Sequence, residues 1–245
     1  CRPMRARAQQ AIGPTPAAKR MRTARMKTDS PKAVVVDGRM LRHSGIGTSI
    51  RGLLAGWRAA APPFAVVLAA DPQVVAETDD MDGVDIRPWK SPVYGARAAL
   101  SRPPVEQGEV FLATHYSAPL FPGVPMVAVV HDVIHITHPT RRGTAAYMRA
   151  YLWMLRRRVR FVVSPSRHTK VQLQTLHGFP AERVLRIPWG PGIAGLAERE
   201  EPRPNMLPDS PYFIAVGINK PHKNWRFLFR ELVSRWEADP AFPAL

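Results

Sequence analysis

The stretch Met126-Val127-Ala128-Val129-Val130-His131-Asp132 joins an unbroken apolar run directly to two ionisable side chains. Such a run predicts a strand that is buried on both faces, as in the interior of a parallel sheet. Open α/β sheets bind their ligands beyond the carboxyl ends of the strands. A buried charge without a partner is costly, so a residue that serves only the core would be apolar there. We therefore expect a functional site at His131 and Asp132.

Similar apolar runs recur along the chain and alternate with helical patterns. The predicted strands are Lys32–Asp37, Phe64–Ala70, Val84–Trp89, Glu109–His115, Met126–Val130, Phe161–Val163, Arg183–Ile187 and Tyr212–Val216. The predicted helices are one that carries Ile50, Leu53, Leu54 and Trp57 on a single face, Thr144–Arg160, Arg167–His177, and one that follows Lys223. This alternation predicts the α/β class with a Rossmann-like parallel sheet.

Composition divides the chain into four parts. Residues 1–31 are basic and lack periodicity, so we expect a disordered tail. Residues 32–193 form the Rossmann-like domain, residues 194–210 are a polar, proline-rich linker, and residues 211–245 begin a second Rossmann-like domain with one strand and one helix. A single strand–helix unit cannot bury its own faces. We therefore expect the chain to be truncated in its second domain and inactive by itself.

The formal net charge of +16 is unevenly distributed, with +7 in residues 1–30 and +9 in the remainder. A basic surface attracts phosphate-bearing partners such as nucleotides, nucleic acid or anionic lipid. Cys1 is the single cysteine, which excludes an intrachain disulfide and favours a reducing compartment. No apolar stretch approaches the roughly 20 residues that span a bilayer. We expect a cytoplasmic protein.

Two motifs have spacings that could hold a metal ion. Asp80 and Asp82 form an Asp-x-Asp beside Gly83, but acidic residues beside glycine are commoner in solvated turns, and these precede a strand. His131 and His135 have the spacing of a zinc-protease motif, but that motif needs a helix, whereas the apolar run predicts a strand. We expect no metal.

Three further features have both a functional and a structural interpretation. Gly45 and Gly47 precede a helix and would let backbone N–H groups approach a phosphate, although an ordinary loop explains them equally well. Lys223 stands at a strand–loop–helix junction that favours an anion, and a surface lysine is the alternative. The basic helix Thr144–Arg160 could lie on an anionic membrane, or it could simply cover the sheet with a solvated face.

Four motifs, taken in order, resemble those of glycosyltransferase family 4, which comprises retaining enzymes of the GT-B architecture and includes mannosyl- and rhamnosyltransferase-like members. The motifs are Ser44-Gly45-Ile46-Gly47, Val130-His131-Asp132, Val163-Ser164-Pro165-Ser166 with the run from Glu182 to Gly190, and Tyr212–Gly217 with Pro221-His222-Lys223-Asn224. The chain departs from the family pattern at His222, where arginine is usual, and at Lys220, where an acid is common.

The resemblance implies two Rossmann-like domains that face each other across a cleft, the first on the acceptor side and the second binding a nucleotide-sugar. His131 would contact the donor sugar near its reacting carbon, and Lys223 would neutralise the diphosphate leaving group. Gly45 and Gly47 would approach the donor phosphates. The resemblance adds further substrate-binding positions at Asp132, Ser164, Gly217 and His222.

The implied function is transfer of a sugar such as mannose, with retention, from a nucleotide-sugar to a glycan or lipid-linked acceptor in polysaccharide and cell-envelope biosynthesis. A GDP- or UDP-linked sugar would be the co-substrate, with no further cofactor, and the protein could contact the anionic inner face of the plasma membrane. The alternative is a non-catalytic basic fragment that binds nucleic acid or an anionic membrane. We do not expect nucleic acid as a partner, because no basic–aromatic recognition motif emerges.

Overall fold

The computed structural model describes residues 30–79, 81–139, 141–190, 212–217 and 220–239, together with Phe242. Seven strands form one sheet: β1 (Ala33–Asp37), β2 (Ala65–Ala70), β3 (Asp85–Pro88), β4 (Val110–Ala113), β5 (Met126–Val129), β6 (Phe161–Ser164) and β7 (Val184–Arg186). Their order is β3-β2-β1-β4-β5-β6-β7, and every neighbouring pair is parallel. The predicted α/β class and Rossmann-like sheet are confirmed.

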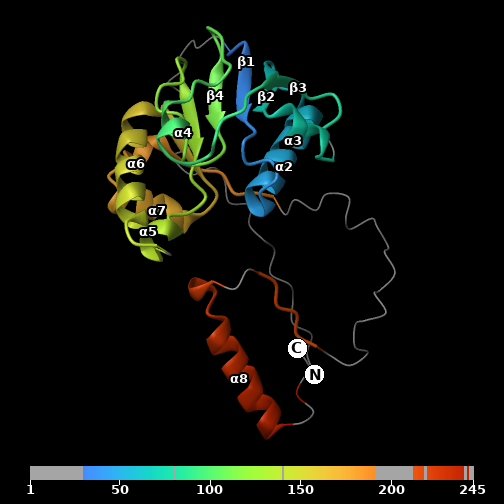
Figure 1. The fold of residues 1–245 in the computed structure, drawn as a ribbon, viewed down its shortest axis with the longest axis vertical. Coiled ribbons are helices and arrows are strands. Elements are labelled where there is room, and N and C mark those ends of the chain that lie inside the picture. The colour runs from blue at the N-terminus through green and yellow to red at the C-terminus, as the bar shows by residue number, and fades with distance from the viewer. Residues whose placement is uncertain are drawn as a thin grey trace, which may run out of the picture.

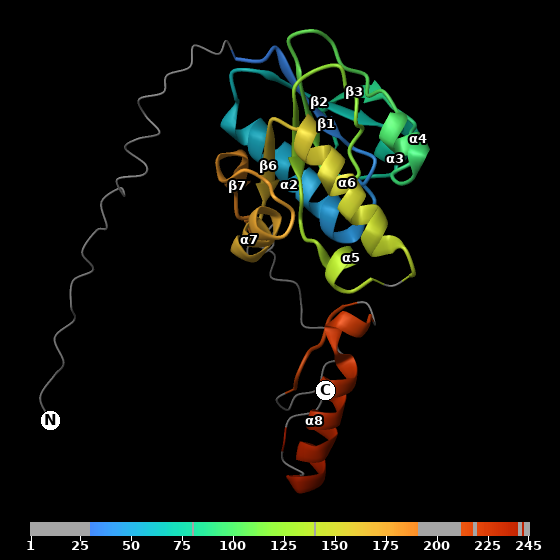
Figure 2. The same ribbon diagram turned by 90° about the vertical axis from the view of Figure 1, so that its left-hand side faces the viewer.

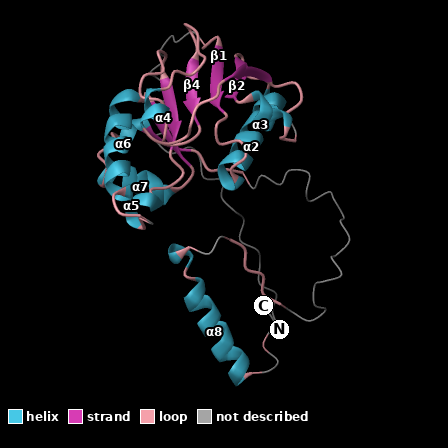
Figure 3. Cartoon of the chain, in the orientation of Figure 1, coloured by secondary structure: helices cyan, strands magenta, loops and turns pink. Residues whose placement is uncertain are grey.

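Helices cover both faces of this sheet (Figure 1). They are α2 (Ser44–Ala60), α3 (Pro72–Ala76), α4 (Ala96–Leu100), α5 (Ile134–Thr137), α6 (Thr144–Arg158), α7 (Arg167–Thr175) and α8 (Trp225–Ala238), with the short 3₁₀ turns η1 (Ala181–Arg183) and η2 (Pro221–Lys223). Figure 3 shows α2 and α3 on one side of the strands and α6 and α7 on the other. Among the described helices none is long and apolar enough to cross a membrane.

The two faces of the sheet form two separate hydrophobic cores. Successive residues of a strand point to opposite faces, so Val35 packs with Leu152 of α6 whereas Val36 packs with Ile50 of α2. The strands β2, β4, β5 and β6 contribute to both cores in the same alternating way. Because both faces are buried, the strands read as continuous apolar runs, which is the pattern that identified them in the sequence.

The chain reverses its direction of winding at β1, which pairs with β2 on one side and with β4 on the other. In a doubly wound sheet the crevice beyond the carboxyl ends of the strands at this reversal is the usual ligand site. The residues that follow β1, β4, β5 and β6 therefore lie along one edge of the sheet, next to this position.

Three predictions need correction or lie beyond the described residues. The predicted strand Tyr212–Val216 is wrong: Tyr212 forms an isolated bridge, and Phe213–Val216 form no strand. A strand needs a neighbouring strand for its backbone hydrogen bonds, and in the described part of the chain no strand pairs with Phe213–Val216. The sequence also missed the short helices α3, α4 and α5. The tail up to residue 29 and the linker at residues 194–210 lie outside the described residues.

Helix α2 begins earlier than predicted, so Gly45 and Gly47 lie in its first turn and not in the preceding loop. A Cβ atom built on Gly47 would lie 2.0 Å from the backbone oxygen of Leu41, whereas one built on Gly45 would meet nothing within 4 Å. Gly47 is therefore required by the close approach of the helix to the loop after β1, and Gly45 is not.

We predict opposite effects of alanine at two glycines of α2. Gly47→Ala should lower the free energy of unfolding by about 1–3 kcal/mol, because the Leu41 backbone must shift to admit the methyl group. Gly52→Ala is the matched control: its site is open, so alanine should raise the free energy of unfolding by up to about 1 kcal/mol. Urea unfolding measures both values. Equal effects of the two substitutions would contradict the close packing at Gly47.

Candidate functional site

A buried ion pair occupies the reversal point between β1 and β4. The Arg39 guanidinium donates from Nη2 to Asp37 Oδ2 at 2.7 Å and from Nε to Asp37 Oδ1 at 3.0 Å, and the two side chains are only 2% and 1% exposed. Arg39 also donates to the carbonyl oxygens of Pro92 and Ser117 at 2.8 and 3.0 Å, and its guanidinium lies 4.5 Å from the ring centre of Trp89. These contacts satisfy two charges that would otherwise be costly to bury.

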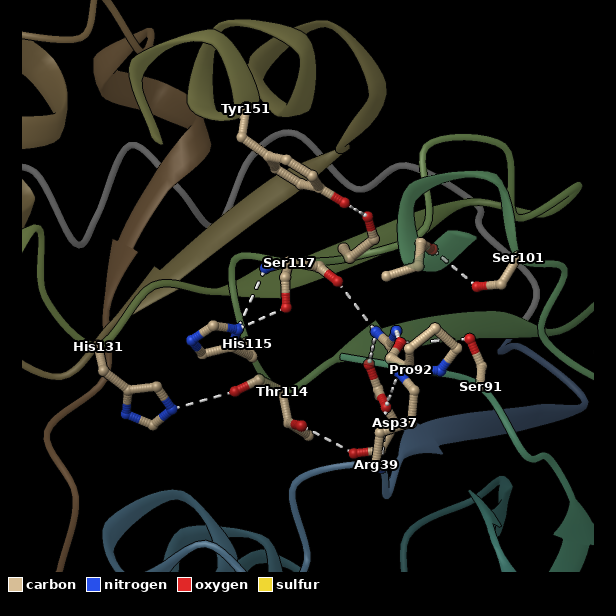
Figure 4. A network of polar contacts seen from close by, with 12 residues as sticks. Asp37, Arg39, Ser91, Pro92, Ser101, Thr114, His115, Ser117, His131 and Tyr151 are labelled. Atoms are coloured by element: carbon tan, nitrogen blue, oxygen red, sulfur yellow. Dashed lines mark hydrogen bonds and ion pairs between the residues drawn. The ribbon is translucent and has the colours of Figure 1, made fainter. Parts of the chain in front are cut away.

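Thr114 connects this ion pair to the predicted site residue His131 (Figure 4). Its hydroxyl donates to the carbonyl oxygen of Asp37 at 2.7 Å, and its own carbonyl oxygen lies 3.0 Å from His131 Nε2. The loops after β1, β4 and β5 are therefore tied together by one continuous chain of hydrogen bonds. The imidazole of His131 is held at the point where the sequence predicted a functional group.

The contacts of His131 fix its tautomer. A carbonyl oxygen can only accept, so Nε2 carries the proton and donates to Thr114. The indole Nε1–H of Trp189 points at Nδ1 from 3.5 Å, which agrees with an unprotonated Nδ1. Burial lowers the pKa of His131 below its ordinary value, although the Thr114 carbonyl and the Asp132 carboxylate oppose this in part. His131 is thus a neutral hydrogen-bond acceptor at neutral pH.

A second histidine, His115, lies in the same loop as Thr114 and is fully enclosed. Its Nδ1 accepts hydrogen bonds from the Ser117 hydroxyl at 2.7 Å and from the Ser117 backbone N–H at 3.2 Å. Its ring centre lies 3.8 Å from that of Tyr116 and 5.6 Å from that of Tyr94. Burial, followed by the nearby His131, lowers the pKa of His115 to about 3. His115 therefore holds the loop in place as a neutral side chain.

Asp132 and Ser164 lie beside His131 and shape the neighbouring loops. Asp132 is exposed, and its Oδ1 accepts from the N–H of Ile134, the first residue of α5, at 3.0 Å. Ser164 is buried at the end of β6, and its hydroxyl donates to the carbonyl oxygen of Ser166 at 3.3 Å. Ser166 then caps α7, whose Thr169 hydroxyl donates to the His131 carbonyl oxygen at 3.2 Å. The structure brings His131, Asp132 and Ser164 together at one sheet edge.

The remaining predicted site residues come from two other places. Gly45 and Gly47 begin α2, directly after the loop of β1. His222 and Lys223 form the 3₁₀ turn η2 before α8, and Gly217, with φ of 147°, lies upstream of that turn. The ring of His222 lies 6.0 Å from the ring of His138, between centroids. Among the described residues no hydrogen bond or ion pair joins Lys223 to His131, so their joint role stays a prediction.

The three histidines between positions 131 and 138 point to different partners. His131 contacts Thr114 and Trp189, His135 packs at 5.9 Å from the Tyr116 ring, and His138 contacts Thr137. Within the described residues no group of three or more histidine, cysteine, aspartate or glutamate side chains is arranged to hold a metal ion.

Sequence reasoning missed Arg39, Thr114 and Trp189 as parts of this site. One signal was available, because Asp37 ends a buried strand and a buried carboxylate requires a partner. The nearest basic residue after it, Arg39, supplies that partner. Thr114 and Trp189 gave no such signal, since their contacts depend on which strands become neighbours.

Comparison with known proteins places the site inside a recognised family segment. Residues 107–190, which contain β4 to β7 and carry His131, Asp132 and Ser164, match Glycosyltransferase Family 4. A solved structure entitled "Crystal Structure Analysis of the Glycotransferase of kitacinnamycin" is similar with a TM-score of 0.31 and 14% identity, over 64% of this chain and 50% of that one. The chain thus spans about half the length of that structure. No curated protein matches the sequence. The family match supports a glycosyltransferase family 4-like domain.

We predict that the buried ion pair contributes more to the free energy of unfolding than an exposed ion pair does. Arg39→Met should lower the free energy of unfolding by about 3–5 kcal/mol, because it leaves the Asp37 carboxylate buried without its partner. Asp37→Asn combined with Arg39→Met should recover a large part of this loss. The control is Arg42→Met, which removes an ion pair with Glu77 whose side chains are 64% and 59% exposed and should cost at most about 1 kcal/mol. Urea unfolding distinguishes these cases, and equal losses for Arg39→Met and Arg42→Met would contradict the proposed importance of burial.

The pKa of His115 predicts a pH-dependent stability. Its folded-state pKa of about 3 lies below the ordinary value of 6.5, so the unfolded chain binds the proton more readily between these values. The stabilising contribution is complete above pH 6.5 and is lost as the pH falls towards 3, by about 1.4 kcal/mol per pH unit.

Urea unfolding at pH 4.5, 5.5 and 6.5 tests this contribution. His115→Asn keeps an acceptor for Ser117 but does not titrate, and it should remove this part of the slope. His168→Asn, at an exposed position of α7, should leave the slope unchanged. If His115→Asn leaves the slope of unfolding free energy against pH unaltered, His115 binds its proton equally well in the folded and the unfolded protein, which contradicts the prediction.

Proposed function

We propose that this chain contributes the acceptor-side domain of a retaining glycosyltransferase. The reaction would move a sugar such as mannose from a GDP- or UDP-linked donor to a glycan or lipid-linked acceptor in polysaccharide and cell-envelope biosynthesis. The observation that carries the proposal is the neutral, oriented imidazole of His131 at the carboxyl end of β5, inside the segment that matches the family.

The tautomer of His131 defines what it would do in such a reaction. Nε2–H is engaged with the Thr114 carbonyl oxygen, so Nδ1 is the atom left to meet a substrate. Nδ1 can accept a hydrogen bond from a sugar hydroxyl but cannot donate one. The contact with Trp189 at 3.5 Å is long, so a hydroxyl group would replace it at little cost. His131 would thus orient the donor sugar near its reacting carbon.

Positive charge for the diphosphate leaving group would come from the protein. Cleavage of the sugar–diphosphate bond builds negative charge on a phosphate oxygen, which preorganised cations and N–H groups stabilise. Lys223 is exposed at the start of α8, and the open surface at Gly45 would admit a phosphate to the first turn of α2. Asp132, Ser164, Gly217 and His222 would complete the substrate contacts.

Residues 211–245 would begin the nucleotide-sugar-binding domain. Support comes from the exposure of its apolar side chains: Ile214 and Val216 are 77% and 83% exposed, and Phe227 of α8 is 51% exposed. Side chains of this kind are normally buried between a sheet and its helices. The proposal places the enzyme in the cytoplasm, with its lipid-linked acceptor at the inner face of the plasma membrane.

We predict that His131→Ala lowers sugar transfer by about 10²–10³-fold, since it removes an oriented polar contact at the reacting centre. Transfer from labelled GDP- and UDP-sugars to a lipid extract measures this effect. His168→Ala, on the exposed side of α7, should leave transfer unchanged. Circular dichroism would check that both variants are folded.

Two outcomes would overturn the proposal. Unchanged turnover in a folded His131→Ala variant would remove His131 from the site. If neither donor binding nor sugar transfer is detected with any GDP- or UDP-sugar, the activity itself is excluded.

A further inference from the structure

The basic charge of the described domain is concentrated in one segment. Residues 133–181 contain nine lysines or arginines and neither aspartate nor glutamate, whereas residues 31–132 and 182–245 taken together carry no net charge. This segment contains α5, α6, β6 and α7. A strong positive field therefore arises from one side of the domain and not from its whole surface.

Helix α6 presents arginines and an aromatic ring on its outer side. Met148, Leu152 and Leu155 face the core and are buried, which leaves Arg149, Trp153 and Arg157 on the opposite stripe at intervals of four residues. Trp153 is 54% exposed, and the Arg157 guanidinium lies 3.6 Å from its ring centre. Figure 2 shows this helix on the side of the domain that faces the viewer.

A second arginine–aromatic pair flanks the first. Phe121 is 51% exposed, and the Arg158 guanidinium lies 4.5 Å from its ring centre. Both residues, with Arg102, line an open hollow of about 680 Å³. Arg160 follows α6 with an exposed side chain. In the described part of the chain, no acidic side chain forms an ion pair with Arg149, Arg157, Arg158 or Arg160.

This combination fits an anionic bilayer better than a nucleic acid. Arginines attract anionic headgroups, and exposed Trp and Phe side chains favour the interface between headgroups and acyl chains. Single-stranded nucleic acid would need open aromatic faces on which bases stack. Here a guanidinium already covers one face of Trp153 and one face of Phe121.

We propose that the α6 face, defined as Arg149, Trp153, Arg157, Arg158 and Arg160 with Phe121, docks the protein on a membrane that contains anionic phospholipid. The four arginines provide positive charge for the anionic headgroups, and Trp153 and Phe121 provide aromatic rings for the membrane interface. This proposal deepens the proposed function by naming the surface that would bring the domain to a lipid-linked acceptor. Docking itself requires neither a donor nor the site at His131.

Vesicle flotation with the full chain tests the proposal. The probe is a vesicle of phosphatidylcholine with 30 mol% phosphatidylglycerol, compared with pure phosphatidylcholine vesicles and with poly(U) RNA. Arg149→Gln, Arg157→Gln and Arg160→Gln together should weaken binding to the anionic vesicles about 100-fold, at about fivefold for each arginine near the surface. Trp153→Ala should weaken binding about tenfold at constant charge.

A matched variant removes three exposed basic side chains elsewhere, by Arg97→Gln, Arg183→Gln and Arg186→Gln, and should weaken binding less than tenfold. Every variant keeps residues 1–29, so the contribution of that segment is common to all. Equal losses in the two triple variants, undiminished binding of the α6-face variant, or tighter binding to poly(U) than to anionic vesicles would each overturn the proposal. Sugar transfer to a water-soluble acceptor should be unchanged in the α6-face variant, which separates failure of docking from failure of catalysis.

Discussion

The carboxyl edge of this sheet depends on the ion pair between Asp37 and Arg39. The pair fills the position where the winding of the sheet reverses, and both side chains are almost completely removed from water. Arg39 also holds the loop after β4 through the Ser117 carbonyl oxygen. A buried pair of this kind tolerates few other arrangements, because the loss of either partner leaves a charge without compensation. The loops that surround the proposed substrate site are therefore built around a fixed polar centre.

Two histidines of the same edge show how burial assigns different roles to one side-chain type. His115 is enclosed between Ser117 and the rings of Tyr94 and Tyr116, and it remains neutral as part of the scaffold. His131 is only partly buried, and one of its nitrogens is committed to Thr114 while the other faces Trp189. Nδ1 of His115 is thus occupied by short hydrogen bonds with Ser117, whereas among the described residues Nδ1 of His131 meets only the long contact with Trp189.

The proposed site and the proposed docking surface use separate parts of residues 107–190. His131 lies in the loop that precedes α5, at the carboxyl edge of the sheet, whereas the α6 face lies on the outer side of a helix whose inner side packs on β-strands. The apolar stripe of α6 explains why the sequence alone left two interpretations for this helix. It covers the sheet with one side, as a structural helix does, and it exposes arginines and Trp153 on the other.

The sequence by itself determined the strands of the sheet and the location of His131 at a strand end, because strands buried on both faces must be apolar throughout and polar residues can follow only where the core ends. It could not determine that Arg39 holds the loop after β4, nor that Thr114 orients His131, because these contacts join β1, β4 and β5 across long sequence separations. It also placed Gly47 in a loop, whereas the tertiary structure shows a helix pressed against the Leu41 backbone. Tertiary structure decided these points because the neighbours of a strand depend on the order of the sheet, which no local pattern of residues encodes.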